Sequence, residues 1–201
     1  QPETIERVNT LTFDIFGTVL DLAGSLVPPL EKLLHECNTP GYLTGADVWK
    51  QWRLRQRLEQ YQENIIMLGH SGYLEVKKKA LLYTLRLLEI EFTYEKVDEF
   101  MKSYHELIPF QDAVSGLKRL GTKYRLVILS NGEEWYLKQL IENNIGIEFN
   151  EILCAEMVSQ FKPHPSVYRF AANRLELEPA QIMMVASHSF DILGARHSGF
   201  R

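Results

Sequence analysis

The chain has 201 residues, a formal net charge of −4 and 45% hydrophobic residues. This length suits one domain with a sizeable insertion, or two small domains. The small negative charge and the lack of a basic stripe argue against a nucleic-acid or membrane-surface partner, and no apolar run is long enough to span a bilayer. We therefore expect a cytoplasmic protein, for which a small anionic substrate stays open.

The first strand is predicted at residues 10–15, where a β-rich run ends at Gly17. Thr18 can cap the segment that follows. Asp14 therefore falls at the carboxyl end of a strand, which is the edge at which open α/β sheets bind ligands.

Residues 21–107 have a helical pattern without strand alternation. Residues 44–47 resemble a capping box that opens a long helix. Apolar residues recur at helical spacing in three groups: Val48, Trp49, Trp52, Leu54 and Leu58; Leu74, Leu81, Leu85 and Leu88; Val97, Phe100 and Tyr104. We predict a helical cap subdomain over 21–107, inserted behind the first strand.

From residue 108 onward, strands alternate with helices. Strands are predicted at 125–129, 151–155 and 182–185, with helices at 112–121, 133–143 and 167–175 and a short last helix ending at Gly199. This alternation implies right-handed crossovers and a parallel sheet. The predicted fold is α/β, with residues 1–20 and 108–201 forming a Rossmann-like core.

Polar side chains follow four of the predicted strands: Asp14 with Thr18, Ser130 with Asn131, Lys162, and His188 with Asp191. Taken singly, each has an ordinary explanation as a helix cap, a turn or a solvated loop residue. Parallel topology, however, brings all four loops to one crevice. Two carboxylates there, Asp14 and Asp191, need a cation, and Lys162 supplies one.

Four motifs in this order resemble those of the haloacid dehalogenase superfamily, and more narrowly those of the L-2-haloacid dehalogenases (type II). They are Phe13-Asp14-Ile15-Phe16-Gly17-Thr18, Leu129-Ser130-Asn131-Gly132, Phe161-Lys162-Pro163-His164-Pro165 with Val167-Tyr168, and Asp191 with Gly194-Ala195-Arg196 and Gly199-Phe200. The resemblance covers the whole chain, including the helical cap. It implies a hydrolase without metal or cofactor, and a homodimer.

Phe16 is the most informative position within these motifs. Superfamily phosphatases generally carry a second Asp there, which protonates an alkoxide leaving group and then activates water. A halide leaves as a stable anion and needs no proton, so an aromatic ring suits dehalogenation. The alternative is that Phe16 simply packs under the cap in an inactive relative.

The resemblance implies conversion of short L-2-haloalkanoic acids to 2-hydroxy acids with inversion. Asp14 attacks the carbon that bears the halogen, and water then cleaves the resulting ester at the Asp14 carboxyl carbon. Lys162 would keep Asp14 ionised and pair with Asp191. Thr18 and Ser130 would orient nucleophile and substrate, and Asn131 would be a positioning residue.

The substrate and the halide need further contacts. The amides around Ile15 and Phe16 could bind the substrate carboxylate, and Tyr168 occupies the family's tyrosine position. Arg53 matches the family's Trp-Arg pair and is our choice for the halide cation, with Arg57 on the same helical face and Arg55 elsewhere. Three residues could wall the halogen or be ordinary core: Tyr73, Met67 and Phe190.

Two positions depart from the family pattern. His188 stands where the dehalogenases have Asn, and Ala186 stands where many have Ser. A neutral imidazole can take a proton from water, so we predict His188 as the general base for ester hydrolysis.

Three other functions stay open. The same nucleophile could open another electrophilic carbon, such as the strained ring of azetidine-2-carboxylate. Asp14, a backbone carbonyl and Asp191 could hold Mg²⁺ in a phosphatase, although Phe16 speaks against it. A catalytically silent binding protein is the remaining alternative, and the joint presence of Asp14, Lys162 and Asp191 argues against it.

Overall fold

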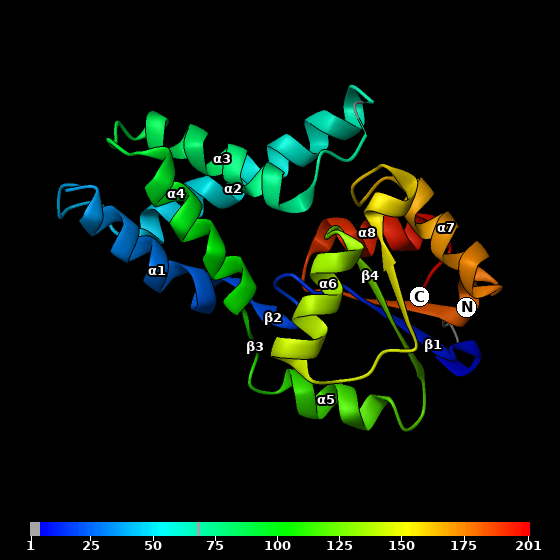
Figure 1. Ribbon diagram of the computed structural model, residues 1–201. Helices are drawn as coiled ribbons and strands as arrows, with labels where there is room; N and C mark the ends of the chain where they lie inside the picture. Colours follow the sequence, from blue (N-terminus) through cyan, green and yellow to red (C-terminus); the bar gives the residue numbers. More distant parts are fainter. Residues whose placement is uncertain (1–4, 68) are drawn as a thin grey trace.

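The computed structural model describes residues 5–67 and 69–201, and its centre is a four-stranded parallel sheet (Figure 1). The strand order is β5 (Glu151–Cys154), β4 (Arg125–Ser130), β1 (Thr10–Phe13) and β6 (Ile182–Val185). Every neighbouring pair is parallel. All carboxyl ends therefore meet at one edge of the sheet, as the alternation of strands and helices predicted.

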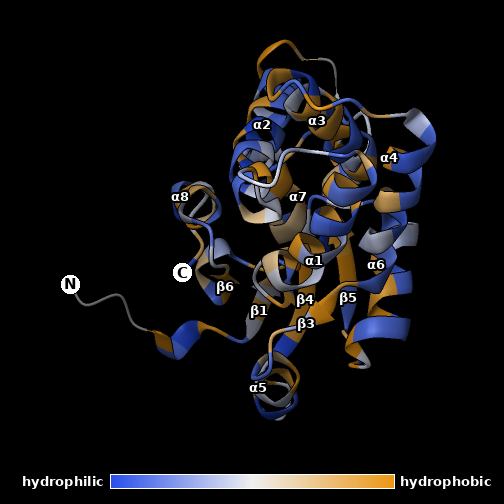
Figure 2. Cartoon of the chain, turned by 90° about the vertical axis from the view of Figure 1, so that its left-hand side faces the viewer, coloured by the Kyte–Doolittle hydropathy of each residue, from blue (hydrophilic) through white to orange (hydrophobic). Residues whose placement is uncertain are grey.

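Helices cover both faces of the sheet. The buried side chains of β4 alternate between two hydrophobic clusters, Leu126 and Ile128 in one, Val127 and Leu129 in the other. The first cluster includes α5 (Ala113–Leu120) and α6 (Glu134–Leu140), and the second includes α7 (Pro165–Leu175) and α8 (Ser189–His197). Burial on both faces explains why β4 is a continuous apolar run, which Figure 2 shows as a hydrophobic ribbon.

Four helices form a separate layer over the carboxyl edge of the sheet (Figure 1). They are α1 (Leu22–Glu36), α2 (Gly45–Ile65), α3 (Tyr73–Leu87) and α4 (Tyr94–Met101). A short antiparallel ribbon of β2 (Leu20–Asp21) and β3 (Ile108–Pro109) brackets them. None of the described helices is long and apolar enough to cross a membrane.

The predicted capping box at Thr44 is confirmed, since its hydroxyl accepts from Asp47 N–H while the Asp47 carboxylate accepts from Thr44 N–H. The assignment of 1–20 with 108–201 to a core domain and of 21–107 to a cap domain stays a prediction. Residues 1–4 and Leu68, which these ranges include, lie outside the described residues.

Candidate active site

Asp14 lies directly after β1, at the carboxyl edge of the sheet. Its N–H donates to the Val185 carbonyl at 3.0 Å, and its side chain is buried, with 5% of the residue exposed. Lys162 Nζ contacts Oδ1 at 3.1 Å, while Thr18 Oγ1 donates to Oδ2 at 2.9 Å and His188 Nδ1 lies 3.2 Å from the same oxygen. Residues distant in sequence therefore converge on one carboxylate.

Lys162 is buried and forms three hydrogen bonds. Its Nζ donates to Asp14, to Asp191 Oδ2 at 2.5 Å and to the Leu129 carbonyl at 2.8 Å. These three acceptors use all three N–H groups of the ammonium. Asn131 Oδ1 accepts from the Lys162 N–H at 2.7 Å and so holds the lysine loop in place.

Tyr168 completes this buried group from α7. Its hydroxyl donates to Asp191 Oδ1 at 2.7 Å, so Lys162 and Tyr168 together occupy both oxygens of that carboxylate. The cation that two neighbouring carboxylates require is thus Lys162, at the distances of ion pairs.

The charges of Asp14, Lys162 and Asp191 shift one another's pKa values. Burial by itself would raise the pKa of Asp14, but the Lys162 ammonium and the hydrogen bond from His188 outweigh it and hold the pKa well below the usual range. Burial raises the pKa of Asp191, and the charge of Asp14 adds to this rise. Burial would lower the pKa of Lys162, yet the two carboxylates raise it. Asp14 is therefore an anion beside a protonated lysine.

His188 bridges the core and the cap. Its Nδ1 faces Asp14 Oδ2, and its Nε2 lies 3.2 Å from Nη2 of Arg53 on α2. Arginine can only donate, and an ionised carboxylate can only accept. The network therefore assigns the proton to Nδ1 and the lone pair to Nε2.

The three cap arginines point in different directions. Arg53 lies beside the Trp49 ring, and its Nη1 donates to Gln56 Oε1 at 2.8 Å. Arg57 lies over the Phe190 ring, with 5.2 Å to the ring centroid. Arg55 instead pairs with a carboxylate of its own helix, Glu59. Arg53 is thus the arginine of this helix that reaches the Asp14 group.

The sequence profile of the haloacid dehalogenase-like hydrolases matches residues 8–199. The chain belongs to this family of hydrolases. It is 30% identical to an (S)-2-haloacid dehalogenase of Xanthobacter autotrophicus over 194 residues, which are 96% of this chain and 73% of that protein.

Solved structures are similar over nearly the whole chain. The L-2-haloacid dehalogenase of Xanthobacter autotrophicus with chloropropionic acid covalently bound has 27% identity and a TM-score of 0.82, over 96% of this chain and 75% of that one. A defluorinating L-2-haloacid dehalogenase has 25% identity and a TM-score of 0.86, over 99% and 81%. The family and the α/β fold class predicted from the motifs are therefore confirmed.

In this haloacid dehalogenase-like hydrolase, Phe16 joins the core to the cap. Its ring stacks on Tyr73 of α3 at 4.0 Å between centroids and lies 5.7 Å from Tyr136 of α6. The Phe16 ring therefore packs under the cap at the same position where superfamily phosphatases carry an acid. Tyr73 is buried in the same stack, and Phe190 lies beside His188 at 5.5 Å between ring centroids.

Ser130 and Met67 need separate descriptions. Ser130 is buried, and its Oγ accepts from the Gly132 N–H at 3.4 Å; among the described residues it has no hydrogen bond with Asp14, and its role in orienting nucleophile and substrate stays a prediction. Met67 does not wall the site, because 79% of it is exposed at the end of α2. Helical spacing could not predict the exposure of Met67, because the residue lies just past the last turn of α2, where its φ of +53° is no longer helical.

Ser187 is a site residue that the sequence reasoning missed. Its N–H donates to Thr18 Oγ1 at 3.0 Å, and its hydroxyl donates to the Gly17 carbonyl at 2.6 Å. It therefore fastens the loop after β6 to the loop after β1. Its place directly before His188, at a strand end, was the available signal.

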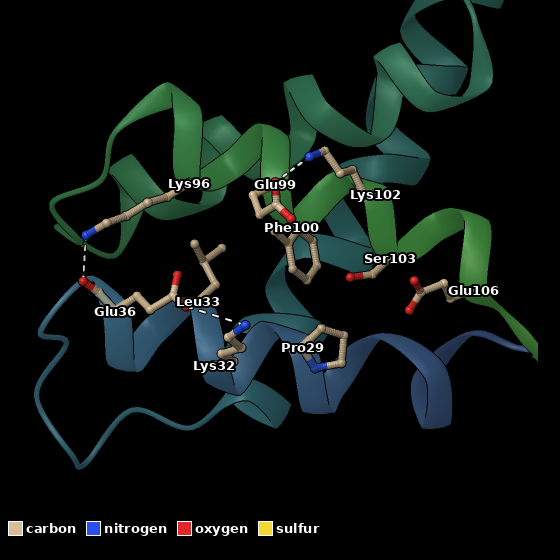
Figure 3. Close-up of a pocket in the computed structure, with 10 residues that line it drawn as sticks. All are labelled: Pro29, Lys32, Leu33, Glu36, Lys96, Glu99, Phe100, Lys102, Ser103 and Glu106. Carbon is tan, nitrogen blue, oxygen red and sulfur yellow. Dashed lines mark hydrogen bonds and ion pairs between the residues drawn. The ribbon is translucent and has the colours of Figure 1, made fainter.

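A groove of about 160 Å³ lies elsewhere on the cap, between α1 and the end of α4 (Figure 3). Its three lysines have partners on its own walls: Lys96 with the Glu36 carbonyl, Lys32 with the Glu36 carboxylate, and Lys102 with Glu99. None of the residues that line it belongs to the Asp14 group. The groove is therefore separate from the candidate active site.

Proposed function

We propose that this protein hydrolyses short L-2-haloalkanoic acids to 2-hydroxy acids, with inversion at C2 and through an ester on Asp14. The observation that carries the proposal is the ionised, buried Asp14 carboxylate paired with Lys162, two residues before an aromatic ring in place of an acid. The similarity to proteins named (S)-2-haloacid dehalogenases supports the substrate class.

In the first step an Asp14 oxygen bonds to C2 while the carbon–halogen bond breaks, and the halide leaves with the bonding electron pair. No proton is needed, so Phe16 does not hinder this step. Lys162 keeps the nucleophile anionic, and Thr18 and His188 fix its orientation. Arg53 supplies the cation toward which the halide departs.

The turn after Asp14 supports a site for the substrate carboxylate. Within the described residues, the N–H groups of Ile15 and Phe16 donate no hydrogen bond, whereas those of Asp14 and Gly17 donate to backbone carbonyls. Two free amides at a strand end are suited to bind an anion. We assign the carboxylate of the haloacid to them.

In the second step water adds to the carboxyl carbon of Asp14, and the bond from that carbon to the ester oxygen breaks. The product hydroxyl then keeps an oxygen that came from Asp14. A base must take a proton from the water. We assign this role to Nε2 of His188, which becomes free once Arg53 has turned from it to the halide. The same nitrogen then returns the proton to the departing alkoxide oxygen, which becomes the product hydroxyl.

The test is halide release from L- and D-2-chloropropionate, with and without a chelator. We expect free chloride from the L form only, unchanged by the chelator, and none from the Asp14→Asn variant. A phosphate-ester arm, in which inorganic phosphate is measured, should give no product. Absence of chloride from every haloacid tested would overturn the proposal.

A single turnover in ¹⁸O-labelled water, with enzyme in excess, tests the ester. We expect a 2-hydroxy acid without label, because its oxygen comes from Asp14, and label in Asp14 afterwards. Label in the product of this first turnover would instead mean that water attacks C2 directly.

A further inference from the structure

His70 reaches from the cap to the loops of the core. It lies in the segment between α2 and α3, and its Nε2 is 2.8 Å from the Asn131 carbonyl oxygen. A carbonyl oxygen only accepts, so Nε2 carries a proton and donates it. The Nε2–H group is present whether or not Nδ1 is also protonated. His70 therefore joins the cap to the loop that follows β4.

The ring of His70 also packs on Phe161. The two ring centroids are 4.1 Å apart, and the ring planes are tilted by 33°. Phe161 directly precedes Lys162, and Asn64 of α2 binds both its N–H and its carbonyl. One side chain of the cap thus contacts both core loops that position Lys162.

Asn131 links His70 to Lys162. Its carbonyl accepts from His70, while its side-chain Oδ1 accepts from the Lys162 N–H at 2.7 Å. Asn131 is 6% exposed, so water does not readily replace either donor. A displaced Asn131 would release the backbone of Lys162, whose Nζ has to reach Asp14, Asp191 and the Leu129 carbonyl at the same time.

The position of His70 is fixed by contacts of the residues that follow it. Ser71 donates from its N–H and from its hydroxyl to the carboxylate of Glu63 on α2, at 3.1 and 2.5 Å. The Tyr73 N–H donates to Oε1 of Glu133, which precedes α6 of the core, at 2.8 Å. The place of His70 is therefore set by the way the cap sits on the core.

We propose that His70 is a positioning residue through which the cap keeps Lys162 in register with Asp14. It fixes Asn131, Asn131 fixes the backbone of Lys162, and the ammonium of Lys162 then meets the nucleophile. The ion pair of the active site thus depends on the seating of the cap. The effect on catalysis rests on the proposed function, whereas the chain of contacts from His70 to Asp14 does not.

A weakened ion pair should be visible in the ionisation of Asp14. Titratable groups face Asp14 from several elements: Lys162, His188, Asp191, Tyr168, Tyr73 and Lys77. Burial raises the pKa of Asp14, and Lys162 is the largest influence that lowers it. Displacement of the ammonium should therefore raise this pKa, so that the ionised nucleophile is lost at a higher pH on acidification.

Two substitutions separate the hydrogen bond of His70 from its packing. His70→Phe keeps an aromatic ring against Phe161 and removes the donor, whereas His70→Gln keeps an N–H group near the place of Nε2 and removes the ring. The first chemical step is measured as halide release from L-2-chloropropionate in a single turnover, with enzyme in excess, as a function of pH.

We expect the first step in His70→Phe to be about tenfold slower near neutral pH, and to slow further as pH falls from about 6 to about 5. The wild type and His70→Gln should have similar rates that stay nearly constant over this range. A histidine that only packs against the core would change stability, but it would not change this pH profile.

The carboxyl ¹³C resonance of Asp14 reports the same ionisation without turnover. In protein labelled at the aspartate carboxyl carbons, the resonance is assigned by its loss in Asp14→Asn. It should keep its ionised position down to about pH 5 in the wild type and in His70→Gln, and it should move in His70→Phe over the same range. Circular dichroism checks folding, and His70→Leu takes the place of His70→Phe if the latter does not fold.

A flat pH profile together with an unmoved Asp14 resonance in His70→Phe would overturn the inference. Equal impairment of His70→Phe and His70→Gln would overturn it too, because packing would then matter and the hydrogen bond would not. A resonance that moves in His70→Phe, in a protein whose wild type releases no halide, would contradict the proposed function alone. Halide release that is unchanged in His70→Phe would contradict this inference alone.

Discussion

In the proposed mechanism, Asp14 acts in the first chemical step and His188 in the second. Asp14 is held as an anion by Lys162, which suits attack on carbon. The Nδ1–H of His188 donates a hydrogen bond to Asp14, and the lone pair of Nε2 faces Arg53. In this arrangement the imidazole cannot take a proton until Arg53 leaves Nε2. The structure therefore adds a condition to the role of base that we assign to His188.

Replacing His188 by Ala should separate the two steps. We expect one equivalent of halide per active site in a rapid burst, followed by little further release, because the ester on Asp14 is not hydrolysed. Mass spectrometry of the quenched protein should show the carboxyalkyl group of the substrate, bound as an ester, on the peptide that contains Asp14. Loss of the burst itself would mean that His188 is needed for the first step.

The same variant allows a pH prediction for Asp14. The pKa of Asp14 is lowered, so its reactive ionised form persists as pH falls and is lost only below that lowered pKa. The burst rate should therefore stay nearly constant from about pH 8 to about pH 5. With the histidine removed, a burst rate that falls around pH 5 or above would show that Lys162 does not depress the pKa of Asp14.

At the scale of elements, the turn after β1 sets the position of His188. Gly17 has φ at +86°, a left-handed conformation that favours glycine. A Cβ added to Gly17 would lie 3.0 Å from Cε1 of His188. The turn and the loop after β6 are therefore fitted to each other, with Ser187 hydrogen-bonded to the Gly17 carbonyl.

Gly17→Ala should consequently affect both stability and the second step. We expect the free energy of unfolding to fall by about 1–2 kcal/mol, from the backbone strain, as measured by urea denaturation. Displacement of His188 should slow ester hydrolysis more than the halide burst. Gly41→Ala is the control, because no atom lies within 4 Å of its added Cβ and its φ is ordinary. Equal loss of both steps would indicate general disorder of the site.

At the scale of the whole molecule, the site exists only where cap and core meet. Asn64 near the end of α2 forms two hydrogen bonds with the backbone of Phe161, directly before Lys162. The Phe16 and Tyr73 stack makes a second connection. These contacts set the distance between Arg53 in the cap and Asp14 in the core.

Asn64→Ala should loosen this connection. It removes both hydrogen bonds and leaves the Phe161 N–H and carbonyl without their partner, so the free energy of unfolding should fall by about 1–3 kcal/mol. We also expect a lower kcat/KM for L-2-chloropropionate, because Arg53 is held less firmly beside His188. Gln62→Ala, on the exposed side of the same helix, should change neither quantity. An unaltered kcat/KM in Asn64→Ala would mean that the cap is positioned by other contacts.

The sequence alone determined the parallel sheet and the group around Asp14, but not the order of the strands. Each polar motif follows a strand, and parallel strands place their carboxyl ends at one edge, so Asp14, Lys162 and Asp191 had to meet. Arg53 was also predictable, through its motif. Contacts that depend on the orientation of a side chain were not predictable. The Ser130 hydroxyl, for example, accepts a hydrogen bond from the Gly132 N–H.

Lys77 shows most clearly what only the tertiary structure decided. In the sequence it is the first of three consecutive lysines, which is typical of a solvated helix face. Its spacing of four residues from both Tyr73 and Leu81 was a signal for the inner face. The three lysines have the same side chain, however, so their charge does not show which of them is buried. Packing of α3 on α2 buries Lys77, because a helix turns adjacent side chains about 100° apart. Lys78 pairs instead with the exposed Asp98, and the exposed Lys79 lies near the carboxylate of Glu63.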